Sequence, residues 1–200
     1  MKRSAVGFHS FSAGRHSLKL LRMVFVRRIC VALMTLVLGT RAFCAAAVTE
    51  RTFEMASKAF ADMFWENAEE DFGNFVRDHR DSPRVPEAIL YQAEARFYMH
   101  RYSDAVSLLS TNQANAGTLG DLYLYWIAES QYQNSNYTAA ADAFGRVARL
   151  FSGSTNRLRA SVGEAAAFAQ SDQWSRTIEL LQDSGGVFQQ LSKTVPNDNC

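Results

Sequence analysis

Few residues in this 200-residue chain have the types and spacing that chemistry requires. Beyond residue 44 the histidines are His79 and His100, which lie 21 positions apart with no cysteine between them. That spacing does not match the paired ligands of a zinc site. The acidic run Glu69-Glu70-Asp71 lacks the alternating ligands of a calcium loop, so we interpret it as a solvated helix face. We therefore expect no metal site.

Motifs for nucleotide binding and for hydrolysis are missing as well. The sequence contains no P-loop, no dinucleotide-binding glycine pattern, no G-x-S-x-G and no H-E-x-x-H. The triplet Asn136-Tyr137-Thr138 matches a glycosylation sequon, and we interpret it as a chance match in a turn between helices. We expect no catalytic residue and no cofactor, and we predict that the chain is not an enzyme.

Charge is divided unevenly along the chain. Residues 1–44 contain eight Lys or Arg and no acid. Residues 45–200 contain thirteen Lys or Arg and all twenty Asp or Glu, a net charge of about −7. An acidic body repels phosphate groups, so nucleic acid is not an expected partner.

The basic leader has the layout of a secretory signal peptide. Arg27 and Arg28 precede a ten-residue apolar run at 29–38, and a segment of mostly small residues follows at 42–47. The run has about half of the ~20 residues that span a bilayer, and an uncleaved membrane anchor is the alternative. We expect a leader over residues 1–44, with Met23 as a possible true start and cleavage between Ala42 and Ala47. The product would be exported to a periplasm.

Cysteine use agrees with export. Cys30 and Cys44 lie in the leader or at its edge, and Cys200 is the last residue. A single remaining cysteine cannot form an internal disulfide, so apolar packing must hold the fold. A lipid on Cys44 is an alternative that would attach the chain to a membrane, although the residues before it make a poor lipobox.

The strongest signal in the sequence is a repeat of 35 to 37 residues, which is typical of solenoids. Aromatic residues mark it, and uncharged residues recur nine positions before, three after and seven after each aromatic. The aromatics are Trp65, Tyr102, Tyr137 and Trp174; the earlier column is Ala56, Ala93, Ala128 and Ala165; the later columns are Ala68, Ala105, Ala140 and Thr177, then Phe72, Leu109, Phe144 and Leu181.

Apolar residues within each copy are spaced by three and four, which indicates helices. We predict helix pairs at 48–62 with 65–79, 86–99 with 102–111, 119–133 with 137–151, and 156–170 with 174–183. The small residues are expected where the two helices of a pair approach closely. The large apolar residue is expected between one pair and the next.

These columns resemble the tetratricopeptide repeat, whose eighth and twentieth positions are small and whose twenty-fourth is large and apolar. The resemblance covers about residues 48–184; the family's usual proline near position 32 is absent, and Thr177 departs from alanine. It implies an all-α, right-handed solenoid of four helix hairpins. Residues 185–200 would be the start of a further repeat or a truncated end. Residues 78–91 and 122–154 resemble bacterial envelope members, of the Tol–Pal-associated periplasmic coordinator and β-barrel assembly lipoprotein types.

The resemblance also implies a peptide-binding groove lined by the first helix of each hairpin. Glu94 and Glu129 share one groove position, with aromatic residues on either side, so we expect a basic or amphipathic protein segment as partner. The alternative is that the aromatics pack against the next hairpin while the carboxylates are solvated. The carried-over positions are Phe53, Ser57 and Phe60; Leu90, Glu94 and Phe97; Tyr125, Glu129 and Tyr132; Val162, Ala166 and Ala169.

The function we expect is a non-catalytic protein-binding scaffold or adaptor in a bacterial cell envelope, with no small-molecule substrate. Two alternatives remain. One is a membrane-attached factor for outer-membrane protein assembly. The other is the N-terminal docking segment of a longer multidomain protein.

Overall fold

The computed structural model describes residues 48–194. The predictions for the signal peptide, for Met23 and for the cysteines lie outside the described residues. Within 48–194 the fold is all-helical and has no strand, as the spacing of apolar residues predicted.

The helices begin and end within one residue of the predicted bounds. Two turns of 3-10 helix at 113–119 were not predicted, and a short helix lies at 187–192, within the segment predicted to be the start of a further repeat or a truncated end. The first helix covers 48–61 of the described residues, and the others are α2 (Trp65–Asp78), α3 (Val85–Tyr98), α4 (Tyr102–Asn112), α5 (Gly120–Gln133), α6 (Tyr137–Leu150), α7 (Arg157–Gln170), α8 (Trp174–Gln182) and α9 (Val187–Ser192).

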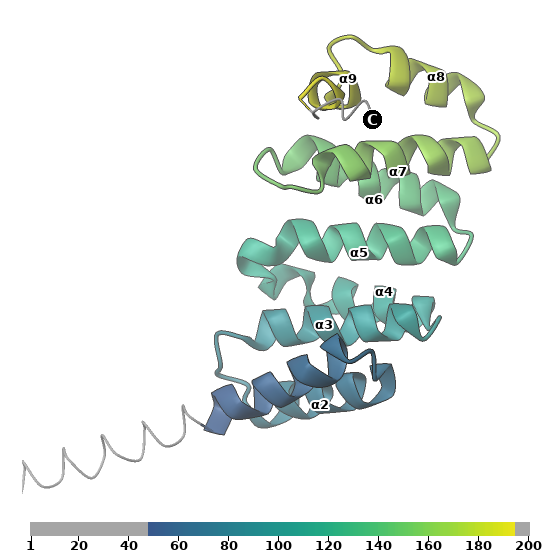
Figure 1. Ribbon diagram of the computed structural model, residues 1–200. Helices are drawn as coiled ribbons and strands as arrows, with labels where there is room; N and C mark the ends of the chain where they lie inside the picture. The colour runs from purple at the N-terminus through teal and green to yellow at the C-terminus, as the bar shows by residue number, and fades with distance from the viewer. Residues whose placement is uncertain (1–47, 195–200) are drawn as a thin grey trace, which may run out of the picture. The chain divides into compact units, whose positions relative to one another are not determined.

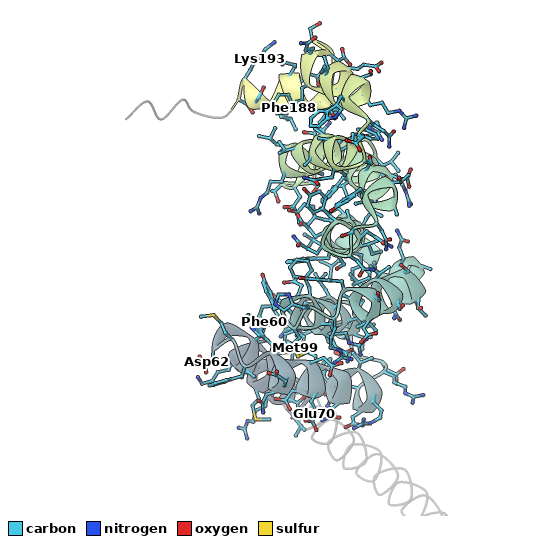
Figure 2. All side chains as sticks on the ribbon, turned by 90° about the vertical axis from the view of Figure 1, so that its right-hand side faces the viewer. Phe60, Asp62, Glu70, Met99, Phe188 and Lys193 are labelled. Carbon is cyan, nitrogen blue, oxygen red and sulfur yellow. The ribbon has the colours of Figure 1, made fainter. Side chains whose placement is uncertain are left out.

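From α2 to α8, each helix packs chiefly against its neighbours in the chain, and α9 packs mainly against α7. Figure 1 shows α3, α5 and α7 lying one above another in chain order, with α4 and α6 behind them. The first helices of successive pairs also touch, α3 with α5 and α5 with α7. Side chains fill the spaces between these layers from Phe60 in the first pair to Phe188 in α9 (Figure 2).

One backbone turn recurs inside all four helix pairs. Its central residue has a φ near +60°, and the residue after it donates a backbone hydrogen bond of 2.8–2.9 Å to a carbonyl five positions earlier. This hydrogen-bond pattern is the Schellman motif at a helix C-terminus. Its residue with positive φ is usually glycine. None of the four residues is glycine: they are Met63, His100, Ser135 and Asp172.

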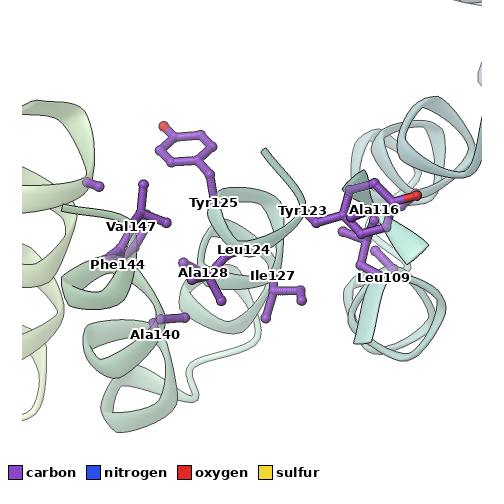
Figure 3. Packing of buried hydrophobic residues seen from close by; sticks show 14 of the residues in the cluster. Leu109, Ala116, Tyr123, Leu124, Tyr125, Ile127, Ala128, Ala140, Phe144 and Val147 are labelled. Carbon is purple, nitrogen blue, oxygen red and sulfur yellow. The ribbon is translucent and has the colours of Figure 1, made fainter. Parts of the chain in front are cut away.

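Alanine pairs lie where the two helices of a pair meet, as the repeat predicted. Ala128 of α5 and Ala140 of α6 are fully buried on adjacent helices (Figure 3), and Ala56 with Ala68 repeats the arrangement in the first pair. In the fourth pair the Thr177 hydroxyl donates to the Ala165 carbonyl at 3.3 Å, which satisfies the polar group that replaces alanine.

The large apolar column separates successive pairs. Phe72, Leu109 and Phe144 are buried, whereas Leu181 is half-buried because only the short α9 lies beyond the fourth pair in the described residues. A buried phenol adds a polar link between pairs: the Tyr123 hydroxyl of α5 donates to the Pro86 carbonyl of α3 at 2.7 Å.

The acidic run at the start of α2 is only partly a solvated face. Glu70 and Asp71 are exposed, but the Glu69 carboxylate accepts hydrogen bonds from Gln92 at 3.2 Å and Arg96 at 2.8 Å, both on α3. The prediction was therefore wrong for Glu69. Its side chain reaches the next helix pair, as its contacts with Gln92 and Arg96 show.

We predict that Ala128→Leu and Ala140→Leu each lower the free energy of unfolding by about 1–3 kcal/mol, because neither site has room for a larger side chain. Ala139→Leu, at an exposed position of α6, is the matched control and should change stability little. Urea unfolding measures all three. Equal midpoints for the inner and outer variants would mean that the helices do not meet at these alanines.

The recurring turn gives a second prediction. Met63 is exposed and in the left-handed region, so Met63→Gly should raise the free energy of unfolding by about 0.5–1 kcal/mol by relieving backbone strain. Met55 is equally exposed but lies inside a helix, where the same substitution should lower stability by about 1 kcal/mol. Thermal unfolding of the two variants compares them; a loss of similar size in both would contradict this reading of the turn.

Candidate partner-binding groove

Three of the predicted groove residues belong to the core. Phe53, Leu90 and Tyr125 are 1%, 4% and 9% exposed. Phe53 packs edge-on against Phe72 and Phe75, and the Arg84 guanidinium covers its ring at 3.4 Å. The prediction that Phe53 and Tyr125 line a groove was therefore wrong, whereas Leu90, although buried, also lines a hollow described below.

Three more predicted residues stabilise the turn within their own helix pair. Phe60, Phe97 and Tyr132 are half-buried. Each packs edge-on against the aromatic that opens the second helix, with ring centroids 5.1–5.4 Å apart: Phe60 on Trp65, Phe97 on Tyr102 and Tyr132 on Tyr137. These ring contacts lie within one repeat, and each of the three side chains stays partly accessible.

Glu94 and Glu129 are the predicted residues that lie together at an accessible surface, the valley between α3 and α5. Both are partly exposed, and the negative charges of both carboxylates raise the pKa of the Tyr98 phenol. Across the valley Trp126 of α5 donates a hydrogen bond to Glu94, and its ring lies 6.1 Å from that of Tyr98. We call these four residues, Glu94, Tyr98, Trp126 and Glu129, the α3–α5 notch.

The rings of the notch are held in place by other rings. Tyr98 stacks on Trp65 with centroids 4.4 Å apart, and Trp126 packs edge-on against Phe97 at 5.1 Å. Tyr98 nevertheless remains 42% exposed. Tyr98 and Trp126 were not among the predicted groove residues, although positions 91, 94 and 98 follow the i, i+3, i+7 spacing of one helix stripe.

The notch is electrostatically unusual. Burial raises the pKa of Glu94 to about 7, and the hydrogen bond from Trp126 offsets part of that shift. Burial, followed by the negative charges of Glu94 and Glu129, raises the pKa of Tyr98. In the part of the chain that the structure describes, neither carboxylate forms an ion pair with Lys or Arg.

An apolar hollow of about 470 Å³ adjoins the notch at Glu94. Side chains from the start of α3 and from the segment that leads into α5 form its walls. The walls combine apolar side chains with the polar groups of Glu87, Tyr91, Glu94 and Thr118. The other wall residues are Pro83, Pro86, Leu90, Ala116, Gly117, Leu119 and Leu122. A carboxylate beside an apolar hollow suits an amphipathic ligand.

A second hollow, of about 490 Å³, lies among α6, α7, α8 and α9. Its buried acid, Glu164, is 5% exposed and already pairs with Arg149 through two contacts of 3.0 Å. Burial raises the pKa of Glu164, and Arg149 opposes the shift. Because its charge is matched from within the chain, this hollow is a weaker candidate for a partner.

No protein-family model matches the chain, and no curated protein matches it significantly. The described residues contain no group of three or more His, Cys, Asp or Glu arranged to hold a metal ion. None of the helices between 48 and 194 combines the length and apolar character needed to cross a bilayer.

The raised pKa of Glu94 predicts a pH-dependent stability. The folded chain holds the Glu94 proton between about pH 4.5 and 7, whereas the unfolded chain releases it, so this site favours folding below pH 4.5 and loses that advantage as pH rises to 7. Glu94→Gln replaces the carboxylate by a neutral amide, so no charge has to be buried at this position when the chain folds. The variant should gain about 1–2 kcal/mol relative to the parent chain between pH 5 and pH 8.

Urea unfolding at several pH values measures that difference. Glu54→Gln removes the same charge from an exposed position of the first helix and serves as the control. The difference between Glu94→Gln and the parent chain should widen with pH, whereas that of the control should stay constant. A parallel response of both variants would contradict the assignment.

Proposed function

We propose that this protein is a non-catalytic binding scaffold of the tetratricopeptide type, which holds a segment of another protein along its first helices. The observation that carries the proposal is the α3–α5 notch with its adjoining apolar hollow. There the fold leaves rings accessible and two carboxylates without a cationic partner among the described residues.

The family assignment and the right-handed solenoid of four hairpins are part of this proposal. Four features support them: the four helix pairs, the alanines at their contacts, the aromatic at the start of each second helix and the turn that recurs with the same period. A stack of such units buries its apolar faces only between neighbours, which leaves the first helices of successive pairs side by side for a ligand.

The partner we propose is a basic or amphipathic segment of a protein. The acidic residues of the body, 45–200, outnumber its basic residues by seven, so its field attracts such a segment and repels nucleic acid. The hollow beside Glu94 offers Leu90, Leu119 and Leu122 to an apolar side chain of the partner. Burial should supply most of the affinity, because an exposed ion pair contributes only ~0–1 kcal/mol.

The location we propose is the periplasm of a bacterial envelope, and the support for it comes from the leader sequence and the family resemblance. A lipid on Cys44 would favour the membrane-attached assembly factor, and mass spectrometry of the exported chain distinguishes the two. A docking segment of a longer protein is the other alternative, and the gene sequence beyond residue 200 tests it.

The direct test is crosslinking of the protein in its native envelope, followed by binding measurements with the captured partner. Tyr98→Ala should weaken affinity about ten-fold, because it removes an accessible apolar ring. Glu129→Gln should act mainly on the association rate and on its dependence on salt. Unfolding measurements on each variant separate lost binding from lost structure.

Arg146→Glu, at an exposed position of α6, is the control for a charge change away from the first helices. If Tyr98→Ala and Glu129→Gln bind like the parent chain while Arg146→Glu abolishes binding, the partner docks on the second helices and the groove proposal is wrong.

A further inference from the structure

We propose that the α3–α5 notch receives one cationic side chain of the bound segment, an arginine guanidinium or a lysine ammonium, between its two rings and its two carboxylates. This inference rests on the proposed function and specifies the chemistry that the groove selects. It makes the notch a specificity site, and the adjoining apolar hollow would hold a neighbouring side chain of the same segment.

The first argument is unmatched charge. Three other acids that are at least partly buried lie against cations: Glu69 with Arg96 at 2.7 Å, Glu87 with Arg84 at 3.0 Å and Glu164 with Arg149 at 3.0 Å. Glu94 and Glu129 have no Lys or Arg nitrogen within 4 Å among residues 48–194. The charges of both nevertheless raise the pKa of the Tyr98 phenol, so both lie near it. A ligand cation would supply the missing counter-charge where partial burial strengthens the interaction.

The second argument is the pair of aromatic walls. The rings of Tyr98 and Trp126 lie 6.1 Å apart at 69° to each other, so together they form a corner instead of a closed stack. A cation is attracted to the face of Tyr or Trp within about 6 Å of the ring centroid. Trp65 and Phe97 pack against these rings and hold them in place. The rings therefore lose little conformational entropy when a ligand binds.

Other occupants fit the notch less well. An anion would meet two carboxylates and no described Lys or Arg nitrogen within 4 Å of either. A calcium ion takes six to eight oxygen ligands, and the notch offers two carboxylates and one phenol, so its donor set is too small. A neutral apolar side chain would cover Glu94 further and supply no counter-charge, at a cost in affinity.

Proton release follows if a cation binds at Glu94, because the bound cation favours the charged carboxylate. The groups around Glu94 are Glu87, Tyr91 and Tyr98 on its own helix and Trp126 on α5. The other acids nearby are Glu87, which lines the same hollow, and Glu129, whose charge acts with that of Glu94 on Tyr98. Affinity for a cation should therefore rise between pH 6 and pH 8, and this rise should depend on Glu94.

The experiment titrates the full-length chain with Nα-acetyl-arginine methylamide, its lysine counterpart and its citrulline counterpart. Citrulline matches the shape of arginine but lacks the charge. Indole fluorescence reports occupancy, because Trp65 and Trp126 border the notch. We expect saturable binding of the two cationic compounds and at least ten-fold weaker binding of citrulline.

Matched variants locate the site. Glu94→Gln should weaken binding of the arginine compound at least five-fold at pH 8 and abolish its rise with pH, whereas Glu54→Gln should leave both unchanged. Tyr98→Phe keeps the ring face and should bind like the parent chain, but Tyr98→Leu keeps only apolar bulk and should bind at least three-fold more weakly. Unfolding curves confirm that each variant is folded.

Equal binding of arginine and citrulline compounds, no saturable binding of either cation, or identical behaviour of Glu94→Gln and Glu54→Gln would overturn the inference. The proposed function fails separately. A captured partner that crosslinks to α3 and α5 while the arginine compound does not bind would leave the scaffold standing without its cation site. A partner that crosslinks only to α4 and α6 would contradict both the groove proposal and the cation site.

Discussion

The close approach of the two helices in each pair is the constraint on which the rest of the described structure depends. It requires a small side chain on both helices at one level, and alanine supplies it at Ala56 with Ala68 and at Ala128 with Ala140. Once the helices are this close, an aromatic can close the turn side of the pair. The large residue four positions after the second alanine then becomes the contact with the next pair.

The stacking of these pairs also creates the notch. Because successive pairs repeat at nearly constant spacing, equivalent residues of α3 and α5 come to lie beside each other, and Glu94 and Glu129 are equivalent. Two acids therefore share one valley, and the valley is partly desolvated by the rings around it. The raised pKa of Glu94 is the energetic consequence, since holding a proton costs less there than holding an unpaired charge.

The sequence predicted the helices better than the site, for a physical reason. Helix bounds follow from local spacing and turn residues, so they could be predicted to within one residue. Burial depends on tertiary packing, which is why Phe53 was assigned to a groove although Phe72 and Phe75 of α2 cover it. Tyr98 and Trp126 became visible as a unit only when α3 and α5 were known to be neighbours. The recurring turn escaped notice because none of its residues is glycine.

Comparison of equivalent positions in the four helix pairs shows which residue types the packing of the fold requires. At the position of Glu94 and Glu129, the first and fourth pairs have Ser57 and Ala166, so packing does not demand an acid there.

At the position of Tyr98, the other pairs have Ala61, Gln133 and Gln170, so packing does not demand an exposed ring either. The residues of the notch are thus departures from the other copies of the same fold. They combine a covered acid with an exposed aromatic, two features that lower stability or solubility when nothing binds. Such departures are expected at positions where residues bind a ligand and do not stabilise the packing of the fold.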